Sequence, residues 1–318
     1  MRKYNLPIFI PHRGCPHDCV FCNQRKITGV ETEVTPGDVR EKIELFLSTV
    51  NMEDASVEVA FFGGSFTGLE LATQEAFLSV AAEFYPTVSG IRISTRPDYI
   101  TEDILDLLKR YGVTTIELGV QSSDDRVLSM NNRGHSFDDV KRASKLIKAY
   151  GISLGHQMML GMYGSDEAKD MKTARDIIEM KPTCVRIYPV ITLKNTALEK
   201  YYNAGEYTPY TLEKAAEICC GAVKLFREND IDVIRMGLHA SEDLEDNNAV
   251  AGPYHPAFGE IVESLIYREK IEKAIVPGEK VCEFRCPERD ISKAVGHKQM
   301  NKKYIWEKYG VKLKVSAI

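Results

Sequence analysis

Three of the eight cysteines stand within eight residues near the N-terminus, as Cys15, Cys19 and Cys22. Thiolates are the usual ligands of iron–sulfur clusters, and a [4Fe–4S] cube has four irons. Three ligands from one short segment leave the fourth iron open to bind another molecule. A closed zinc site would need a second cysteine pair close by, and none follows. The spacing therefore favours an open iron–sulfur cluster over a zinc site and over ordinary thiols.

The position of these cysteines supports the same interpretation. They follow the apolar run 6–10, which reads as a short strand, and reactive loops follow strand ends in α/β barrels. The C-x3-C-x2-C segment resembles the signature of the radical S-adenosylmethionine (SAM) superfamily. That resemblance implies that Cys15, Cys19 and Cys22 hold a [4Fe–4S] cluster. It also implies that SAM binds the open iron and is cleaved to a 5′-deoxyadenosyl radical, and that Phe21 packs near the adenine.

A pair of glycines follows the next apolar run, in the order Gly63, Gly64 and Ser65. Glycine lets the backbone come close to a ligand and leaves its N–H and C=O groups free to bind it. Taken alone, such a pair is typical of a tight turn. In this superfamily it resembles the Gly-Gly-Glu motif that binds the methionine amino group, with Ser65 in place of the acidic residue. Gly-Gly-Thr/Ser-Phe versions occur in the branch that is similar to the Elongator catalytic subunit.

Four polar residues match the SAM-contacting pattern of the branch that includes oxygen-independent coproporphyrinogen oxidases: Ser94, Gln121, Arg133 and Gln157. Ser94 and Gln121 end predicted strands, and Gln157 stands within one, where relatives carry an acidic ribose ligand. The Arg133 guanidinium is suited to hold the methionine carboxylate through two parallel hydrogen bonds. Each residue alone would be an ordinary structural hydrogen bonder, but together around one rim they favour a SAM site.

Strand-like apolar runs alternate with helical patterns along the chain, which indicates repeated βα units. Helix starts are marked by Thr35, Thr101 and Ser136. The predicted strands are 6–11, 57–62, 91–95, 115–120, 153–160 and 184–190, with a further short strand at 232–235. This pattern predicts an α/β fold, an open (βα)6 partial TIM barrel with a small C-terminal α+β appendage. A doubly wound sheet fits the alternation equally well, so only the cysteine segment and the resemblance favour the barrel.

The last forty residues have a different pattern, strand, helix, turn, helix and strand, with the turn at 296–299. A KH module clamps nucleic-acid backbone with a Gly-x-x-Gly loop at that place. The run 290–301 resembles KH repeats of bacterial transcription-elongation factors, with Gln299 in place of the second glycine. An appendage that only packs on the barrel is the alternative. The expected organisation is a radical SAM core at 1–240, a helical linker at 241–277 and a KH-like segment at 278–318.

The formal net charge of −5 is unevenly distributed. Between Arg268 and Lys314 there are 13 Lys and Arg against 7 Asp and Glu. A basic tail on an acidic core indicates an anionic partner such as nucleic acid, although a solvated surface can have the same composition. The sequence has no signal-peptide core and no run of about 18 apolar residues. We therefore expect a cytosolic protein with no membrane partner.

Taken together, the sequence predicts a radical SAM enzyme similar to the Elongator catalytic-subunit core, with a [4Fe–4S] cluster and SAM as cofactors. An RNA, above all tRNA, is the expected substrate, and a flavodoxin- or ferredoxin-type protein is the expected one-electron reductant. The chain ends too soon for the acetyltransferase domain of the family's tRNA-modifying members, so their chemistry is not carried over. One alternative is an enzyme for a small molecule such as a tetrapyrrole-type precursor. Another is a non-catalytic iron–sulfur protein that binds RNA.

Overall fold

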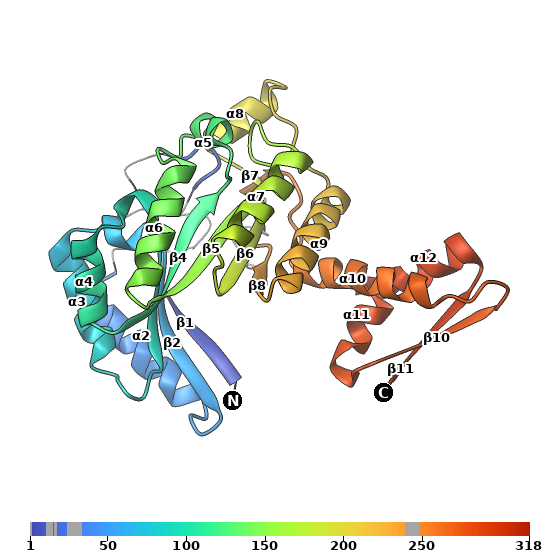
Figure 1. Ribbon diagram of the computed structural model, residues 1–318, viewed down its shortest axis with the longest axis horizontal. Coiled ribbons are helices and arrows are strands. Elements are labelled where there is room, and N and C mark those ends of the chain that lie inside the picture. The colour runs from blue at the N-terminus through green and yellow to red at the C-terminus, as the bar shows by residue number, and fades with distance from the viewer. Residues whose placement is uncertain (1, 11–14, 16–17, 24–33, 239–247) are drawn as a thin grey trace.

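A single parallel sheet forms the main body of the molecule in the computed structural model, which describes residues 2–10, 15, 18–23, 34–238 and 248–318 (Figure 1). Residues 11–14 and 16–17 of the cysteine-rich stretch lie outside the described residues, as do residues 239–247 at the predicted boundary between core and linker. The sheet has seven strands: β1 (Arg2–Ile10), β2 (Ala55–Gly63), β3 (Gly90–Thr95), β4 (Val113–Gln121), β5 (Ser153–Leu160), β6 (Cys184–Pro189) and β8 (Asp232–Met236).

The order of the strands distinguishes between the two folds that the sequence allows. Neighbours in the sheet follow the order of the chain, β1-β2-β3-β4-β5-β6-β8, and every adjacent pair is parallel. A doubly wound sheet reverses its strand order at a switch point, whereas a barrel does not. The partial barrel is therefore confirmed, and the short strand predicted at 232–235 is its last strand.

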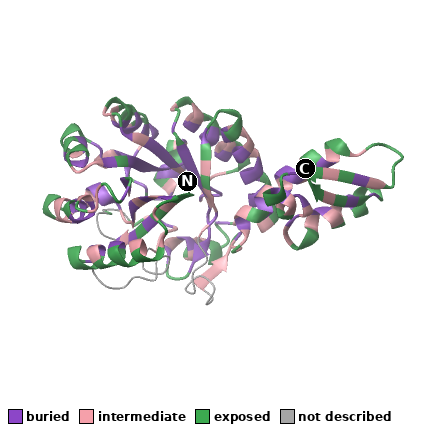
Figure 2. Cartoon of the chain, turned by 90° about the horizontal axis from the view of Figure 1, so that it is seen from below, coloured by how far each residue is buried: buried purple, intermediate pink, exposed green. Residues whose placement is uncertain are grey.

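Helices cover the outside of this sheet and connect its successive strands (Figures 1 and 2). Parallel neighbours require such crossover connections, and the sheet between them is correspondingly apolar and buried. Within the described residues, six crossover helices connect the strands: α2 (Pro36–Thr49), α3 (Leu71–Ala82), α4 (Glu102–Arg110), α6 (Phe137–Ala149), α7 (Glu167–Glu179) and α9 (Leu212–Glu228).

Three of these helices begin where the sequence predicts. The side chains of Thr35, Thr101 and Ser136 each accept a hydrogen bond from a backbone N–H of the first helical turn, at 3.2, 3.3 and 3.3 Å. In α2 and α6 the side chains of Asp38 and Asp139 accept from the cap residue in return, which completes a capping box. These local bonds satisfy N–H groups that a helix start leaves without partners.

Shorter elements surround the carboxyl end of the sheet. The single turns η1 (Phe66–Gly68) and η2 (Pro97–Tyr99) follow β2 and β3. Helices α5 (Asp125–Met130) and α8 (Ala197–Asn203) lie beyond β4 and β6, and a two-stranded antiparallel ribbon joins β7 (Thr192–Leu193) to β9 (Ala249–Ala251). None of these six elements has a counterpart among the predicted strands and helices.

The C-terminal module is a separate small core next to the barrel (Figures 1 and 2). It has the predicted strand–helix–helix–strand order, and its two strands pair in parallel. Its elements are β10 (Val281–Cys286), η4 (Glu288–Asp290), α11 (Ile291–Val295), η5 (His297–Gln299), α12 (Met300–Tyr309) and β11 (Lys312–Ala317).

One long helix, α10 (Phe258–Ala274), connects the barrel and the C-terminal module. Ile261 and Val262 pack in the main core, while Tyr267 and Ile271 pack in the core of the module. The helix lies within the predicted linker 241–277, and it is shared by both cores instead of spanning a gap between them. No helix in the described part of the chain is long and apolar enough to cross a membrane.

Candidate active site at the carboxyl end of the barrel

A cavity of about 440 Å³ opens at the carboxyl ends of the barrel strands. Strand ends from β1 to β8 contribute to its wall, which is where barrel enzymes place their reactive groups. Six of the residues predicted to serve the cluster or SAM line this cavity: Phe21, Cys22, Gly63, Ser94, Gln121 and Gln157. A more open hollow of about 650 Å³ lies at the opposite end of β1 and β2, and none of the predicted residues lines it.

The described part of the cysteine segment is held against the barrel by hydrogen bonds from distant residues. The Val20 N–H donates to the carbonyl of Asn131 at 3.3 Å, and the Val20 carbonyl accepts from the Leu198 N–H at 2.8 Å. The Asn132 side chain donates to the Asp18 carbonyl at 3.0 Å. Val20 itself is buried in a small apolar cluster that is separate from the main core. These contacts place Cys22 at the rim of the cavity.

The three thiols lie on this segment, and each is free of disulfide bonds. Cys19 Sγ accepts a hydrogen bond from Nη1 of Arg133 at 3.3 Å. The Cys15 thiol contacts the backbone of Ser65. Among the described residues no group of three His, Cys, Asp or Glu side chains is drawn together closely enough to hold a metal ion. The donor set nevertheless suits a cluster, because cysteine thiolates are the ligands that iron–sulfur clusters use.

Gln121 and Arg133 show the clearest signs of a ligand site. Gln121 has a left-handed backbone with φ of 64°, a conformation that costs energy for a residue other than glycine. Its side-chain oxygen and the Nε of Arg133 are both buried without a hydrogen-bond partner. Buried polar atoms are almost always paired. Gln121 and Arg133 were both predicted to contact SAM, and each has a buried polar atom without a partner. A binding site for a polar ligand would contain such atoms.

The close approach of these two side chains depends on Gly119 in β4. A Cβ at Gly119 would stand 2.9 Å from Nε2 of Gln121 and 3.2 Å from Nη2 of Arg133. The Arg133 guanidinium also donates to the Gly119 carbonyl at 3.1 Å. A Cβ at this position would displace the ends of both side chains, so the strand itself shapes the site.

The Gly-Gly-Ser segment is tightly packed. Gly63 has φ of 108°, and a Cβ there would meet the Ile10 carbonyl oxygen at 2.8 Å. The Gly64 N–H donates to that same carbonyl at 2.8 Å. The Ser65 hydroxyl is buried and bonds the hydroxyl of Thr95 at 2.8 Å. Of this segment, only Gly63 reaches the cavity wall. The Gly64 N–H and the Ser65 hydroxyl bond to the protein.

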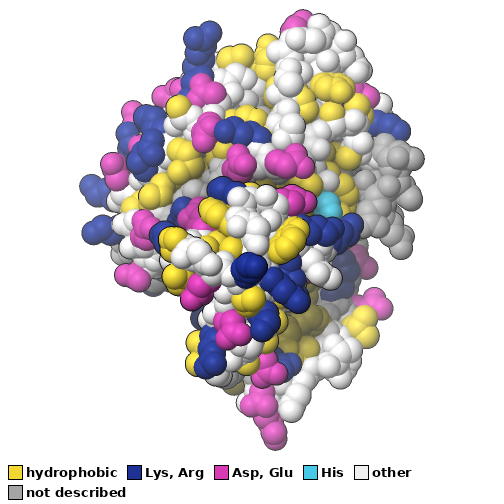
Figure 3. Space-filling model, turned by 90° about the vertical axis from the view of Figure 1, so that its right-hand side faces the viewer, with side chains coloured by type: hydrophobic (Ala, Val, Ile, Leu, Met, Phe, Trp, Pro, Cys, Tyr) yellow, Lys and Arg dark blue, Asp and Glu magenta, His cyan; other side chains and the backbone are white. Residues whose placement is uncertain are grey.

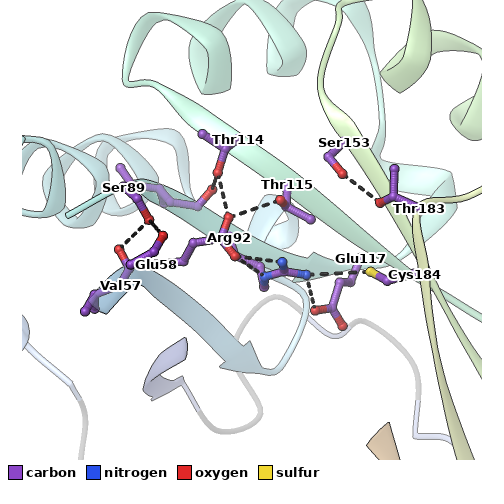
Figure 4. Close-up of polar contacts among 12 residues, drawn as sticks. Val57, Glu58, Ser89, Arg92, Thr114, Thr115, Glu117, Ser153, Thr183 and Cys184 are labelled. Carbon is purple, nitrogen blue, oxygen red and sulfur yellow. Dashed lines mark hydrogen bonds and ion pairs between the residues drawn. The ribbon is translucent and has the colours of Figure 1, made fainter. Parts of the chain in front are cut away.

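A buried polar network runs across the barrel strands, and Figure 4 shows its part formed by Glu58, Arg92 and Glu117. Glu117 in β4 is 1% exposed and accepts two hydrogen bonds from Arg186, at 2.6 and 3.0 Å, and one from Arg92 at 2.9 Å. Arg92 also pairs with Glu58 in β2 at 2.7 Å. Although burial acts to raise the pKa of Glu117, the Arg186 and Arg92 guanidiniums hold that pKa below its usual value. The carboxylate is therefore charged and compensated.

This network supports two of the predicted SAM residues. Gln157 donates from one amide nitrogen to Glu117 at 2.9 Å and to the Ser94 hydroxyl at 3.0 Å. Sequence reasoning did not identify Glu117 or Arg92 as part of the site. The available signal was their charge within otherwise apolar strands, because buried charges need partners on neighbouring strands.

The half of the cavity formed by β6 and β8 has a basic lining. Arg186 and Arg235 both line it, and no carboxylate does among the lining residues that the structure describes. Arg186 is paired with Glu117 and lies over the ring of Phe62 at 4.9 Å. Arg235 donates to the carbonyls of Gly237 and Leu238, at 3.0 and 2.9 Å. This half of the cavity therefore suits an anionic group.

Two buried histidines near the barrel strands make the fold sensitive to acid. Burial lowers the pKa of His156 to about 3, and burial together with the charges of Arg133 and Arg96 lowers the pKa of His135 to about 3. The folded protein thus keeps both rings neutral, while the unfolded chain binds protons below about pH 6.5. Burial raises the pKa of Asp170 to about 6, which acts in the opposite direction.

We therefore expect the free energy of unfolding to decrease as the pH falls from about 6.5 toward 4, by up to about 1.4 kcal/mol per pH unit for each histidine. Protonation of Asp170 in the folded protein offsets part of this loss, because it removes the unfavourable burial of a charged carboxylate. Urea unfolding across this pH range measures the slope, and His156→Gln should make it shallower. An unchanged slope in that variant would contradict a neutral buried His156.

The fold is an α/β partial barrel, and the cysteine segment lies at the carboxyl ends of its strands. Barrel enzymes place their catalytic residues at this end. The model of the radical SAM superfamily matches residues 9–177, and the model of a radical SAM C-terminal domain matches residues 182–268. The chain therefore belongs to the radical SAM superfamily, and it is an enzyme of that class. Enzymes of this class use a [4Fe–4S] cluster and SAM as cofactors.

Curated relatives point to a particular branch of this superfamily. The chain is 29% identical over 246 residues to the tRNA uridine(34) acetyltransferase of Methanocaldococcus jannaschii, covering 64% of this chain and 45% of the relative. It is 27% identical over 248 residues to Elongator complex protein 3 of Schizosaccharomyces pombe, covering 63% and 45%. The chain thus spans about half the length of the curated relatives it matches.

Solved structures agree on the fold. The archaeal Elp3 of Methanocaldococcus infernus, with an N-terminal deletion, superposes with a TM-score of 0.65 at 24% identity, over 84% of this chain and 63% of that one. Coproporphyrinogen III oxidase from Escherichia coli superposes with a TM-score of 0.52 at 17% identity, over 72% and 53%. The predicted likeness to the Elongator-like core is confirmed.

Proposed function

We propose that this radical SAM enzyme modifies an RNA, with tRNA as the first candidate. The observation that carries the proposal is the similarity to relatives named for tRNA uridine(34), together with a basic C-terminal module of KH-like element order. Acetyl transfer is not part of the proposal, because the match covers only 45% of the relative that bears that name. A flavodoxin- or ferredoxin-type reductant in the cytoplasm would supply the electron.

The proposal assigns the cluster to Cys15, Cys19 and Cys22. When bound, the cluster and SAM supply a 5′-deoxyadenosyl radical that takes a hydrogen atom from the substrate. The protein binds, orients and shields the reacting groups. The 440 Å³ cavity at the cysteine segment lies within the range of small-molecule sites, which are about 300–1,000 Å³.

The residues proposed to hold SAM divide into three kinds. Arg133, with an unpaired Nε, is assigned to the methionine carboxylate, and Gln121 offers an unpaired amide oxygen beside it. Phe21 offers an aromatic surface for the adenine. The remaining proposed contacts are backbone or hydroxyl groups and one amide: Gly63, Gly64, Ser65, Ser94 and Gln157. Because the hydroxyl of Ser65 and the N–H of Gly64 already bond to the protein, we assign these two residues to shaping the backbone.

The C-terminal module supports an RNA substrate through its sequence and its element order. The turn between its helices, 296–299, follows the KH pattern except at Gln299, which has a left-handed backbone with φ of 63°. A glycine adopts that conformation without cost. Asn301, just after the turn, is buried and donates to the carbonyls of Ser264 and Ala294, at 2.8 and 3.1 Å. The turn therefore has the backbone shape that a glycine would give it.

The proposal is tested by quantifying 5′-deoxyadenosine from anaerobically reconstituted protein with SAM and dithionite, with and without bulk tRNA. We expect tRNA to raise the rate several-fold, because substrate binding completes the site. Double-stranded DNA at the same phosphate concentration is the matched control and should leave the rate unchanged.

Other outcomes favour other functions. Cleavage that tRNA does not affect would overturn the RNA proposal and favour a small anionic substrate, for which the guanidiniums of Arg186 and Arg235 would provide the recognition. A loaded cluster without any SAM cleavage would favour a non-catalytic iron–sulfur protein.

A further inference from the structure

The single tryptophan of the chain, Trp306, lies exposed on α12 of the C-terminal module. Its relative exposure is 61%, the highest of any Trp, Tyr or Phe among the described residues. Leaving so large an apolar ring in water forfeits burial energy that a core position would provide. An exposed aromatic ring of this kind is therefore a candidate for contact with a partner.

Two of the immediate neighbours of Trp306 on the helix surface are basic. Residues three and four positions apart are adjacent on an α-helix, so Lys303 and Lys302 lie beside the indole ring. Neither lysine forms an ion pair with any residue that the structure describes. The next lysine, Lys308, is held differently: its ammonium bonds the Glu272 carboxylate at 2.9 Å. Lys302 and Lys303 are thus the two cations beside the ring that remain available for an external anion.

The charge of the whole module agrees with that of its helix. The segment 278–318 holds 10 Lys and Arg against 5 Asp and Glu, in a chain whose net charge is −5. Figure 3 looks onto the end of the molecule that this module forms, where Lys and Arg side chains lie among hydrophobic ones. A flat apolar ring between cations is the arrangement that binds single-stranded nucleic acid, since each base presents a face for stacking and each phosphate a charge.

The turn at 296–299 has a glycine-like backbone but lacks the second glycine of a Gly-x-x-Gly clamp. A Gly-x-x-Gly clamp relies on close approach of the nucleic-acid backbone, and here Gln299 carries an exposed side chain where the second glycine would stand. The binding energy for RNA must then come from side chains elsewhere on the module.

We propose that the face of α12 formed by Lys302, Lys303 and Trp306 binds a single-stranded segment of RNA. An unpaired base stacks on the Trp306 ring, and the two ammonium groups neutralise the flanking phosphates. This inference rests on the proposed function in requiring an RNA partner, and it adds the place where that RNA is held outside the barrel.

The test uses the full reconstituted chain and a labelled single-stranded oligouridylate, whose anisotropy gives the affinity. Because Trp306 is the only tryptophan, intrinsic indole emission reports on this face alone. We expect unlabelled RNA to quench that emission over the same concentration range in which anisotropy rises. W306A should weaken binding about tenfold, in line with the loss of one stacked base, while W306F should retain most of the affinity.

Charge is tested separately with the double variant K302Q/K303Q. Removing two phosphate contacts should make the slope of log affinity against log salt shallower by about 1.4 for a single strand. K42Q/K145Q is the control, because Lys42 and Lys145 are exposed lysines on α2 and α6 of the barrel. The control should bind as the wild type does.

Four results would overturn the inference, and they separate it from the proposed function. RNA binding with unchanged indole emission places the RNA elsewhere and leaves the proposed function intact. Equal losses in K302Q/K303Q and K42Q/K145Q indicate non-specific attraction. Emission that changes with protein concentration alone indicates that a second copy of the chain covers the face. Absence of any RNA binding overturns this inference. The proposed function would be overturned as well only if tRNA also failed to change the rate of SAM cleavage.

Discussion

Cys19→Ala is expected to abolish formation of 5′-deoxyadenosine by the reconstituted protein. Cys19 is the proposed cluster ligand that also accepts a hydrogen bond from Arg133, the proposed SAM carboxylate ligand, at 3.3 Å. In the proposed site, this thiol would therefore lie next to the side chain that holds SAM. Loss of residues that merely support a metal ligand costs about 10- to 100-fold in affinity or activity. Loss of a ligand itself should exceed that range and remove iron from the protein.

The measurements are iron and sulfide content, cluster absorbance and the yield of 5′-deoxyadenosine. Cys286→Ala provides the matched control, because Cys286 is a free, buried cysteine in the C-terminal module. The control should load iron and cleave SAM as the wild type does. If Cys19→Ala kept its iron and its SAM cleavage, the assignment of the cluster to this segment would be wrong.

Glu117→Gln should cause the largest loss of stability of any single isosteric substitution considered. The carboxylate is the shared counter-charge of Arg92 and Arg186, which are themselves mostly buried. Removing one partner from a buried ion pair costs about 3–5 kcal/mol, because the remaining charges stay in a low-dielectric interior. We expect urea unfolding at neutral pH to show a decrease of that order, with an unchanged dependence on denaturant concentration.

Glu83→Gln is the comparison, since Glu83 pairs with Arg40 at the surface with about half of each side chain exposed. Exposed pairs contribute little, so this variant should unfold almost as the wild type does. The pKa of Glu117 lies below its usual value in the folded protein, so its contribution is present above that value and is lost as the pH falls. The difference between wild type and Glu117→Gln should therefore shrink in acid. Equal stability of the two glutamine variants at neutral pH would contradict the role assigned to the network.

Local signals in the sequence predicted most of the elements of the fold. Apolar periodicity and helix caps depend on residues within one or two turns of each other, as the bonds of Thr35 and Ser136 to their own helices illustrate. The strand–helix–helix–strand order of the C-terminal module follows from the same short-range information. The spacing of Cys15, Cys19 and Cys22 likewise belongs to one segment, and it pointed to the superfamily that the family model matches.

Only the tertiary structure decided which distant residues meet. The hydrogen bond between Arg133 and Cys19 joins residues 114 positions apart, and that between Arg186 and Glu117 joins residues 69 apart. Strand order and register set such contacts, and both depend on how the whole sheet assembles instead of on local periodicity. The same reason explains why the sequence left a doubly wound sheet open. A helical linker was predicted at 241–277, but neither the sharing of α10 by two cores nor the exposure of the Trp306 ring was predicted from its own segment.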